Sequence, residues 1–550
     1  QRLRTKGCGD VGDKRLWTKV DASSFLSLET IDTFIPPDLG RYPYPFTSLT
    51  TLADSPRLLF VLPDAPTSAE LTAAAAIAAS LGQTSAWEQP PLEAIPAGQL
   101  EAAEAANHHL LVIGSPARNP LAAGAAPGLT EKTSPYNANR LLLIVAGDTD
   151  PQLQQAANML ATASAWRSFA GSHADLSPVA PLPPPQRVTR ATFAELGFSD
   201  RRVRGIGSHD LYYPLDVPYN WKPTSDAFIE VRFSHASVSL DERLSKMSAF
   251  VNGFKVSDVS LTKRNDTNGR LVIQLSPRQI HPGRNWLHLA FDLHVKGEDC
   301  NFRYLQEAWA IVSAEKSSLN LAHVNGEPPL ELRYLPSPLV TPADLSADVF
   351  VLAAHPSAAE LTAMVRLAAK LGTYTTADGL RPRALTADTF QPAETSTDHI
   401  IAIGGPETNT LLAHYDSALP QHLTLPAENG PETPRELLEP LPPSIEYHAG
   451  YLQVLPAPWS RRGTLMVLGA FEEPLLAKAV AAFPTLGTRL KIQGNVAVVT
   501  PEQVIGLNIG SLTETQLPDN IRRLLAALLI GGFALIGGFG WRASRRKNGK

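Results

Sequence analysis

The feature that most constrains the fold of this chain is an internal repeat, in which short segments recur in the same order about 290 residues apart. SAELTA at Ser68 recurs as AAELTA at Ala358, and LLVIGSP at Leu110 recurs as IIAIGGP at Ile400. In both copies a short apolar strand precedes the first segment and an Ala-rich helix follows it. Since 550 residues also exceed what one hydrophobic core holds, the repeat predicts duplicated domains rather than one compact enzyme fold.

The repeat contains two kinds of domain. Segments 31–190 and 326–500 alternate apolar strands with Ala-rich helices, which is typical of a parallel sheet covered on both faces, and we expect flavodoxin-like α/β domains there. Segment 191–325 alternates apolar and polar residues instead, which predicts an antiparallel sandwich of jelly-roll size. The alternation is clear in two runs: Ala227, Ile229, Val231 and Phe233, and Leu287, Leu289, Phe291 and Leu293.

A further repeated pair marks the end of each sandwich. A cysteine and a tryptophan stand with eight residues between them in both copies, as Cys8 and Trp17 and as Cys300 and Trp309. Residues 1–30 are therefore expected to be the C-terminal remnant of a first jelly-roll domain. The cysteines occupy equivalent positions in separate domains, so a Cys8–Cys300 disulfide and a pairing of Cys8 elsewhere both stay open.

The C-terminal end carries an apolar stretch. The eighteen residues from Leu524 to Trp541 contain no charged side chain, and a helix of that length is about 27 Å long, which matches a bilayer core. More basic residues follow the stretch than precede it, so the positive-inside rule places the tail in the cytoplasm. We expect a connecting or interfacial segment at 501–521, a transmembrane helix at 522–542 and a cytoplasmic tail at 543–550.

Four small residues form one stripe within this span, at spacings of four, three and four: Ala527, Gly531, Ala534 and Gly538. Small residues let a second helix approach closely, so the stripe favours docking on another membrane helix. The other interpretation is that glycine is simply tolerated in membrane helices.

The domain order, the duplication and the C-terminal span, together with C-x8-W, VNG at Val251 and PGRNWL at Pro282, resemble the B subunit of bacterial cellulose synthase. The resemblance covers essentially the whole chain. It implies carbohydrate-binding-like jelly rolls alternating with flavodoxin-like domains that lack the cofactor. It also implies a non-catalytic protein of the periplasm, held to the bacterial inner membrane by one C-terminal helix.

The same resemblance implies the partners. The catalytic cellulose synthase subunit, a membrane glycosyltransferase, is the expected neighbour of the anchor, and a nascent β-glucan is the expected ligand. Further copies of the chain and other periplasmic export proteins are additional candidates. Two alternatives stay open: a membrane-anchored extracytoplasmic glycan-binding receptor or adhesin that is not tied to a synthase, and a glycan-modifying enzyme.

The sequence carries no motif for nucleic-acid binding, metal binding, hydrolysis or phosphate binding. The net charge of −5 provides no basic field for nucleic acid, and two cysteines exclude cysteine-built metal sites. Neither G-x-S-x-G nor H-E-x-x-H is present. The loops after the first α/β strands, at Pro63–Pro66 and Ala353–Pro356, contain prolines, which offer no N–H to a phosphate. We expect no catalytic site, no metal and no bound cofactor.

The family is traditionally named for binding cyclic di-GMP. A common binding motif, R-x-x-x-R followed by [DN]-x-S-x-x-G, is missing, because the R-x-x-x-R at Arg542–Arg546 has only four residues after it. We expect that ligand to bind to the catalytic partner rather than to this chain.

Aromatic residues of the sandwich are the candidates for glucan contact, because sugar rings lie with their C–H faces against aromatic rings. Four of them gather within ten residues: Tyr212, Tyr213, Tyr219 and Trp221. Packing over the end of a sheet is the alternative role for this group. Trp286 has the opposite phase to Leu287 and the apolar row that follows, so it faces solvent, a neighbouring domain or a glucan.

Overall fold

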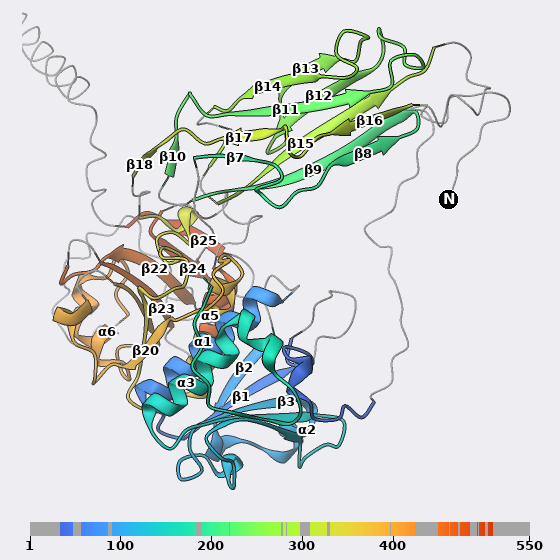
Figure 1. Cartoon of the computed structure of the whole chain (residues 1–550). Coiled ribbons are helices and arrows are strands. Elements are labelled where there is room, and N and C mark those ends of the chain that lie inside the picture. The colour runs from blue at the N-terminus through green and yellow to red at the C-terminus, as the bar shows by residue number, and fades with distance from the viewer. Residues whose placement is uncertain are drawn as a thin grey trace, which may run out of the picture.

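The computed structural model describes residues 33–47, 57–85, 91–182, 189–218, 221–276, 279–281, 283–296, 308–326, 330–395, 398–423, 449–460, 463–470, 473–483, 492, 494–500 and 504–509. Figure 1 shows that they form an antiparallel sandwich and two α/β domains. The expected first-domain remnant, both cysteines, the membrane helix at 522–542 and the tail lie outside the described residues. Within those residues, no helix combines the length and the apolar character needed to cross a membrane.

The first α/β domain is built on one six-stranded sheet. Its strands are β1 (Leu58–Leu62), β2 (Leu92–Pro96), β3 (His109–Ile113), β4 (Gly128–Thr133), β5 (Leu141–Ala146) and β6 (His173–Asp175), and its helices are α1 (Ser68–Thr84), α2 (Ala102–Asn107) and α3 (Asp150–Ala161). The sheet order is β2-β1-β3-β5-β4-β6. Strands β2, β1, β3 and β5 run parallel, whereas β4 pairs antiparallel with β5, and β6 pairs antiparallel with β4.

The second α/β domain repeats this plan. Its strands are β19 (Asp348–Leu352), β20 (Arg383–Thr386), β21 (His399–Ile403), β22 (Gly450–Pro456), β23 (Thr464–Ala470), β24 (Val496–Val499) and β25 (Val504–Leu507), and its helices are α5 (Ala358–Gly372), α6 (Thr410–Tyr415) and α8 (Leu476–Ala481). The order is β20-β19-β21-β23-β22-β24-β25, and the pairs β23–β22, β22–β24 and β24–β25 are antiparallel. Strand β25 extends this sheet into the segment that the sequence predicted to be a connector.

The antiparallel strands correct the expectation of parallel, flavodoxin-like sheets. The parallel part of each domain follows the first four positions of the 2-1-3-4-5 order of such sheets, and antiparallel strands take the place of the fifth. The reason is connection length: β4 and β5 are joined by seven residues, as are β22 and β23. So short a link permits an antiparallel pair but not a crossover to a parallel strand.

The segment between the α/β domains forms the predicted antiparallel sandwich. One sheet has the order β13-β12-β15-β9 and contains β9 (Gly207–Val217), β12 (Lys246–Val251), β13 (Phe254–Ser260) and β15 (Gly283–Leu293). The other contains β7 (Arg190–Thr192), β8 (Arg201–Arg204), β11 (Phe228–His235), β14 (Gly269–Gln274), β16 (Trp309–Val312) and β17 (Ser318–Asn320). A two-stranded ribbon adds β10 (Trp221–Pro223) and β18 (His323–Asn325).

Short 3-10 helices join several elements: η1 (Leu39–Arg41), η2 (Ala97–Gln99), η3 (Pro120–Ala122), η4 (Ala163–Ser168), η5 (Leu332–Tyr334), η6 (Pro392–Thr395), η7 (Asp416–Ala418) and η8 (Glu473–Leu475).

The repeated SAELTA and AAELTA segments begin helices α1 and α5 with the same capping box. Thr67 Oγ1 accepts a hydrogen bond from Glu70 N at 3.3 Å, and Thr67 N donates to Glu70 Oε2 at 2.8 Å. Ser357 and Glu360 make the same two contacts at 3.3 and 2.9 Å. Each box satisfies two donors at a helix start, which explains why the two segments share this pattern.

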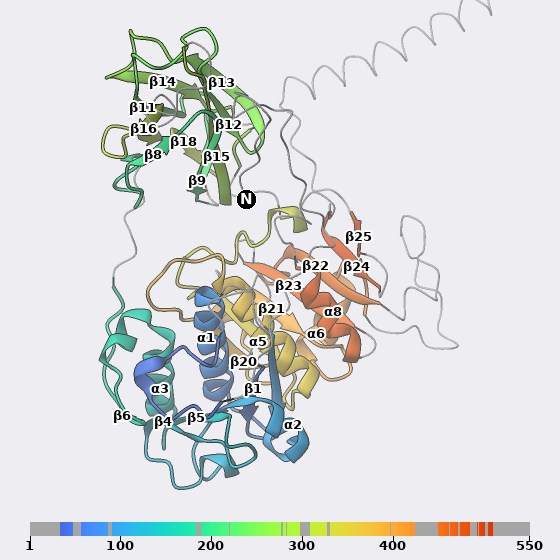
Figure 2. The same cartoon turned by 90° about the vertical axis from the view of Figure 1, so that its right-hand side faces the viewer.

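The two α/β domains pair through these helices, which lie side by side in Figure 2. Thr72 Oγ1 on α1 accepts a hydrogen bond from Ala384 N on β20 at 2.9 Å and donates to Ala384 O at 3.0 Å. Thr362 on α5 does the same with Ala94 on β2, also at 2.9 and 3.0 Å. Since β2 and β20 are edge strands, each helix satisfies exposed backbone groups on the sheet edge of the other domain.

Glycines allow the close approach of the paired helices. A Cβ atom on Gly82 would lie 1.9 Å from the carbonyl oxygen of Ala369, and a Cβ atom on Gly372 would lie 1.9 Å from that of Ala79. Gly372 lies 290 positions after Gly82, and Ala369 lies 290 positions after Ala79, so the two contacts are equivalent in the repeat. The interface therefore follows a pseudo-twofold axis that relates the two copies.

The inner faces of the two sheets share one hydrophobic core. Phe60 of β1 and Phe350 of β19 belong to the same cluster of buried side chains, together with α1, α3 and α5. The outer faces have separate cores, one around Val61 and the other around Val351. The α/β pair is consequently one packed unit rather than two domains joined by a flexible link.

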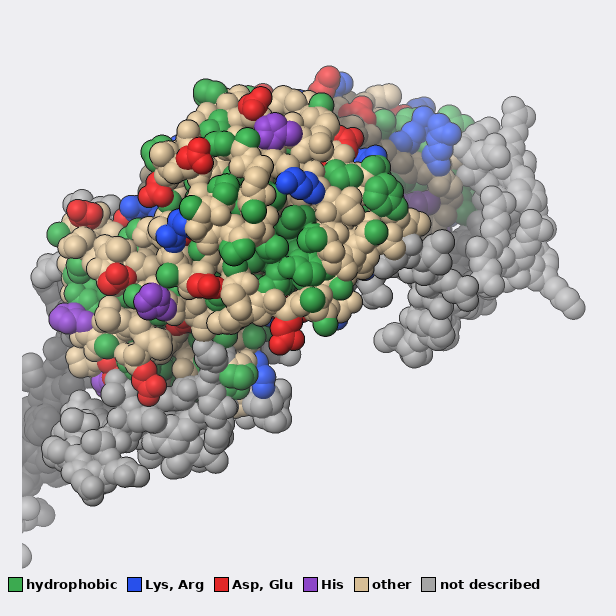
Figure 3. All heavy atoms as spheres, turned by 90° about the horizontal axis from the view of Figure 1, so that it is seen from below, with side chains coloured by type: hydrophobic (Ala, Val, Ile, Leu, Met, Phe, Trp, Pro, Cys, Tyr) green, Lys and Arg blue, Asp and Glu red, His purple; other side chains and the backbone are tan. Residues whose placement is uncertain are grey.

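The α/β pair shows no dominant charge pattern on the face seen in Figure 3. Acidic and basic side chains are scattered there, and hydrophobic side chains gather near the middle of the face. This face therefore does not by itself mark a binding surface for a strongly charged partner.

Candidate functional site

One face of the sandwich exposes aromatic side chains. Along β15, residues alternate between buried and exposed positions. Leu287 and Leu289 lie in the core, whereas Trp286 is 41% exposed. The predicted phase of this strand is confirmed, and Trp286 stands on the outer face of the β13-β12-β15-β9 sheet.

Three rings from three neighbouring strands form a stack on the same face. The centroids of Tyr212 on β9 and His288 on β15 lie 4.4 Å apart, with 7° between the ring planes. His288 is also stacked on Phe250 of β12, at 5.0 Å and 22°. The strand register produces this row, because His288 is paired with Tyr212 on one side and with Phe250 on the other. We call these three residues and Trp286 the aromatic face.

Asp210 fixes the central ring of the aromatic face. His288 Nε2 lies 2.6 Å from Asp210 Oδ1, and an ionised carboxylate only accepts hydrogen bonds, so Nε2 is the donor. Tyr212 is 49% exposed. The ring of Tyr212 is therefore stacked on the fixed ring of His288, and the exposed part of the Tyr212 ring is accessible to a ligand.

Two asparagines hold the backbone of Trp286. Asn252 and Gly253 form the two-residue turn between β12 and β13, and both have positive φ, at 50° and 85°. Asn252 Oδ1 accepts a hydrogen bond from Trp286 N at 2.9 Å, and Asn252 Nδ2 donates to the buried Asn285 Oδ1 at 2.8 Å. The VNG and PGRNWL motifs thus meet at the start of the aromatic face.

Charged side chains surround the rings. Arg284 on β15 makes a two-point contact with Asp216 on β9, at 3.0 and 3.1 Å. Asp292 lies 3.2 Å from His294 at the other end of β15. Aromatic faces bounded by such groups suit a sugar chain, since the rings receive C–H faces and the charged groups meet hydroxyls.

The structure separates the predicted aromatic residues into two groups. Tyr212 and Trp286 share the aromatic face, whereas Tyr213 points into the core, where it packs on Phe193 at 5.0 Å. Burial raises the pKa of Tyr213 to about 12. Trp221 is also buried, and it stacks on His323 at 3.5 Å. These two are therefore not offered to a ligand, because their neighbours in the sandwich cover them.

Tyr219 lies outside the described residues. Phe250 and His288 belong to the aromatic face but were not among the predicted contacts. The signal for His288 was the period-two phase that it shares with Trp286. Phe250 could be placed only once the pairing of β12 with β15 was known.

The opposite sheet carries a hollow of different character. It has a volume of about 570 Å³ and is lined mainly by polar and charged groups, among them Arg190, Thr192, Glu230, Arg232 and Lys316. Glu230 accepts hydrogen bonds from Arg232 at 2.6 Å and from Arg270 at 3.0 Å, and Arg270 is the first cause that lowers its pKa. Of the described residues that line this hollow, none is aromatic, so they provide no stacking surface like that of the other face.

The first α/β loop already holds a carboxylate at its helix start. Glu70 is buried, accepts from Thr67 N and forms an ion pair with Arg118 Nε at 2.8 Å. A bound phosphate would have to share this helix start with a negative charge, which is unfavourable. Among the described residues, no group of His, Cys, Asp and Glu is arranged to hold a metal ion.

Three domain models of one family match the chain in order. They are described as cellulose synthase BcsB, first FD domain, at residues 38–174, first CBM domain at 186–325 and second FD domain at 334–447.

Two curated proteins are similar in sequence. A cyclic di-GMP-binding protein of Xanthomonas axonopodis pv. citri (strain 306) is 24% identical over 454 residues, which are 76% of this chain and 56% of that protein. A protein of the same name from Pseudomonas fluorescens (strain SBW25) is 31% identical over 163 residues, which are 28% of this chain and 20% of that protein. The chain therefore spans at most about half the length of these relatives.

Solved carbohydrate-binding modules are only weakly similar to this chain. A family 35 module from an environmental isolate covers 23% of this chain and 76% of its own, with 12% identity and a TM-score of 0.14. The CBM36 module in complex with calcium and xylotriose covers 22% and 78%, with 12% identity and a TM-score of 0.13. Scores this low say nothing about the ligand of this chain. The three successive domain models, in contrast, cover most of the sequence, and the chain belongs to the cellulose synthase BcsB family.

Proposed function

We propose that this chain is a non-catalytic subunit of a bacterial cellulose synthase complex and that its aromatic face guides the nascent glucan away from the catalytic subunit. The observation that carries this proposal is the row of Tyr212, His288 and Phe250 beside the exposed Trp286. Aromatic side chains are normally buried, so four of them on one open sheet face suit a ligand with apolar faces.

The shape of the site suits guiding better than storage. The rings stand on an open sheet face, and even a contact between two aromatic rings is worth only about 0.5–1.5 kcal/mol beyond the area that it buries. A polymer held by a few such contacts can advance, whereas a polymer enclosed by hydrogen bonds on all sides would be retained. The surrounding carboxylates and arginine give polar contacts without closing the site.

Support of the catalytic subunit is the second part of the proposal. The apolar stretch at 522–542 would anchor the chain in the inner membrane, with the bulk in the periplasm. The stripe of Ala527, Gly531, Ala534 and Gly538 would face a helix of the glycosyltransferase, because small residues allow close helix contact. Cyclic di-GMP, for which the curated relatives are named, would bind to that partner; tight binding in a calorimetric titration of this chain alone would contradict this.

Cello-oligosaccharide binding tests the aromatic face. Trp286→Ala and Tyr212→Ala, separately and together, should weaken the binding of cellohexaose by the full chain, with the double variant losing most of it. Val272→Ala is the matched control, because Val272 is an exposed apolar residue on the opposite sheet. Unchanged affinity in the double variant would overturn the assignment of this face.

Co-purification tests the role as a subunit. The full chain should be isolated together with a multi-span glycosyltransferase, and Gly531→Leu with Gly538→Leu should reduce the amount of that partner. A chain that binds cellohexaose but purifies alone would instead be a membrane-anchored glycan receptor or adhesin. Wild-type recovery of the partner with both leucines present would contradict docking through the small-residue stripe.

A further inference from the structure

His108 lies at the boundary between the two α/β domains with oxygen atoms at both ring nitrogens. It directly follows α2, and its side chain is 5% exposed. Nδ1 is 2.7 Å from the carbonyl oxygen of Glu104, whereas Nε2 makes no hydrogen bond among the described residues and lies within ion-pair distance, 3.4 Å, of Glu93 Oε2. A neutral imidazole has one donor and one acceptor. The carbonyl needs a donor at Nδ1, and the carboxylate within ion-pair distance of Nε2 favours a proton there as well, so the site fits the doubly protonated ring.

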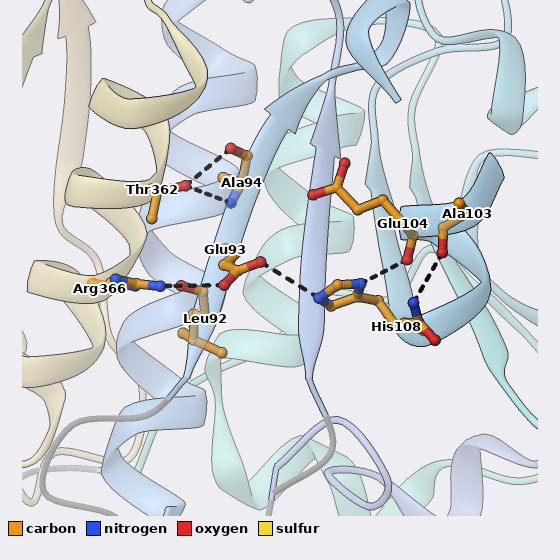
Figure 4. Close-up of polar contacts among 9 residues, drawn as sticks. Leu92, Glu93, Ala94, Ala103, Glu104, His108, Thr362 and Arg366 are labelled. Carbon is orange, nitrogen blue, oxygen red and sulfur yellow. Dashed lines mark hydrogen bonds and ion pairs between the residues drawn. The ribbon is translucent and has the colours of Figure 1, made fainter. Parts of the chain in front are cut away.

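Glu93 connects this ring to the second domain. Figure 4 shows its carboxylate between His108 and Arg366, which extends from α5. Arg366 Nη2 lies 3.4 Å from Glu93 Oε1, and Arg366 Nε donates to the carbonyl oxygen of Leu92 at 2.7 Å. A chain of alternating charges, His108, Glu93 and Arg366, therefore crosses the domain boundary beside the Thr362 contact.

The second copy has an ion pair at the same place, with reversed charge. Positions 290 residues after Glu93 and His108 are Arg383 and Asp398, and these two side chains form a short salt bridge. The pair in the first copy contains a histidine, which as a residue type titrates between pH 5 and 8, and the pair in the second copy does not. The position equivalent to Arg366 in α1 is Ala76, so the link across the boundary exists in one copy alone.

We propose that His108 is a proton-controlled latch between the α/β domains. Protonated His108 holds the Glu93 carboxylate beside Arg366 and so fixes α5 on the edge strand β2. When the proton leaves, a lone pair on Nε2 faces the carboxylate, Glu93 loses its nearest cation on that side, and the contact with Arg366 weakens. The symmetric contact of α1 with β20 contains no such group and keeps its strength.

The surrounding charges agree with this direction. The Glu93 carboxylate is the first cause that raises the pKa of His108, and His108 is the first cause that lowers the pKa of Glu93. The other charged groups near the pair are Glu104, which also raises the pKa of His108, and Arg57 and Arg366, which lower that of Glu93. A raised histidine pKa stabilises the contact fully below pH 6.5 and loses that effect as the pH rises through the folded-state pKa.

Hydrogen exchange on the full chain tests the latch, with rates corrected for the intrinsic exchange at each pH. In the wild type, protection of β2 should fall by about threefold to fivefold between pH 6 and pH 9, because the ion pair is partly exposed. Protection of β20 is the internal control and should fall less than that of β2 over the same range. His108→Gln should keep β2 at one level of protection at every pH.

Two further variants separate the latch from a general loss of stability. Arg366→Gln should lower the protection of β2 at all pH values and abolish its pH dependence. Asp398→Asn should lower the protection of β20 equally at all pH values and leave the pH dependence of β2 intact. Equal protection of β2 at pH 6 and pH 9 in the wild type, or an unchanged pH dependence in Arg366→Gln, would overturn the proposal even if His108→Gln failed to fold.

Discussion

Asn252 and Asn285, which lie 33 residues apart in the sequence, share a hydrogen bond of 2.8 Å from Nδ2 of the first to Oδ1 of the second. Asn285 is fully buried and also accepts from His281 N at 3.0 Å. Through Asn252 Oδ1 the pair reaches the backbone N–H of Trp286. These hydrogen bonds join the turn between β12 and β13 to the start of β15, and together the two segments hold the backbone of the exposed Trp286.

Removing the Asn252 side chain should therefore affect both stability and ligand binding. Asn252→Ala leaves three polar partners without these hydrogen bonds and replaces asparagine, which tolerates positive φ, with alanine, which does so less well, so we expect a loss of about 2–3 kcal/mol in the free energy of unfolding. Asn252→Gly is the control for the backbone, since glycine accepts this φ. Urea unfolding should show a smaller loss for glycine, and cellohexaose binding should weaken in both variants; a fully stable alanine variant would contradict this role.

The threonines that cap the two sheet edges should be equivalent. Thr72→Val and Thr362→Val keep the side-chain shape but leave a backbone N–H and a carbonyl on the opposite edge strand without a partner, which costs about 1–3 kcal/mol for each variant. Thr84→Val is the matched control, because Thr84 bonds only to carbonyls of its own helix. Chemical denaturation should give similar losses in the free energy of unfolding for the two interface variants. A loss confined to one of them would show that the two symmetric contacts do not contribute equally to stability.

Glu131 should make stability depend on pH in the weakly acidic range. Burial raises the pKa of this carboxyl to about 7, against the opposing effect of a hydrogen bond from Asp38 N. An acid with a raised folded-state pKa costs nothing below its ordinary value near 4.5 and destabilises the fold increasingly as the pH rises to about 7. Glu131→Gln should become more stable relative to the wild type between pH 4.5 and 7 in urea unfolding, whereas a constant difference would contradict it.

Asp348 offers a stabilising substitution. Its carboxyl is fully buried without a hydrogen-bond partner among the described residues, and burial raises its pKa well above the ordinary value, with further increases from Asp344 and Asp398. The equivalent position of the first copy is Leu58, also fully buried. Asp348→Leu should therefore stabilise the protein at pH 7 by about 1–3 kcal/mol.

The gain from Asp348→Leu should shrink as the pH falls below the ordinary aspartate pKa of 3.8, where the wild-type carboxyl becomes protonated in both the folded and the unfolded chain. Asp348→Asn is the control, because it removes the charge but keeps a polar group in the same place. Thermal or urea unfolding at several pH values distinguishes the three proteins, and a destabilised leucine variant would mean that the carboxyl has a stabilising contact.

The sequence predicted local structure and the sandwich phase well. The two copies of the ELTA segment mark real helix starts because a capping box is a local arrangement, complete within four residues. The placement of Trp286 on an outer face likewise needed only the period of a strand. The same period, applied to Tyr212 and Tyr213, would have separated the exposed ring from the buried one.

Strand direction, strand register and the contacts between domains could not be predicted from local sequence patterns. The antiparallel β4 and β22 occupy positions next to the last parallel strand, and nothing in their composition distinguishes a strand that enters by a hairpin from one that enters by a crossover. The stack of Tyr212, His288 and Phe250 depends on the register of three strands, which sequence separation alone does not give. The contact of Thr72 with Ala384 joins groups 312 residues apart.

The reciprocal glycine contacts carry a consequence for how such a chain can arise. A surface that meets a copy of itself across a twofold axis is isologous, the arrangement found in dimers of identical subunits. Gly82 against Ala369 and Gly372 against Ala79 meet this condition within one polypeptide. The α/β pair has the architecture of a homodimer fused into a single chain. The sandwich is inserted in the segment that connects the two halves of this fused dimer.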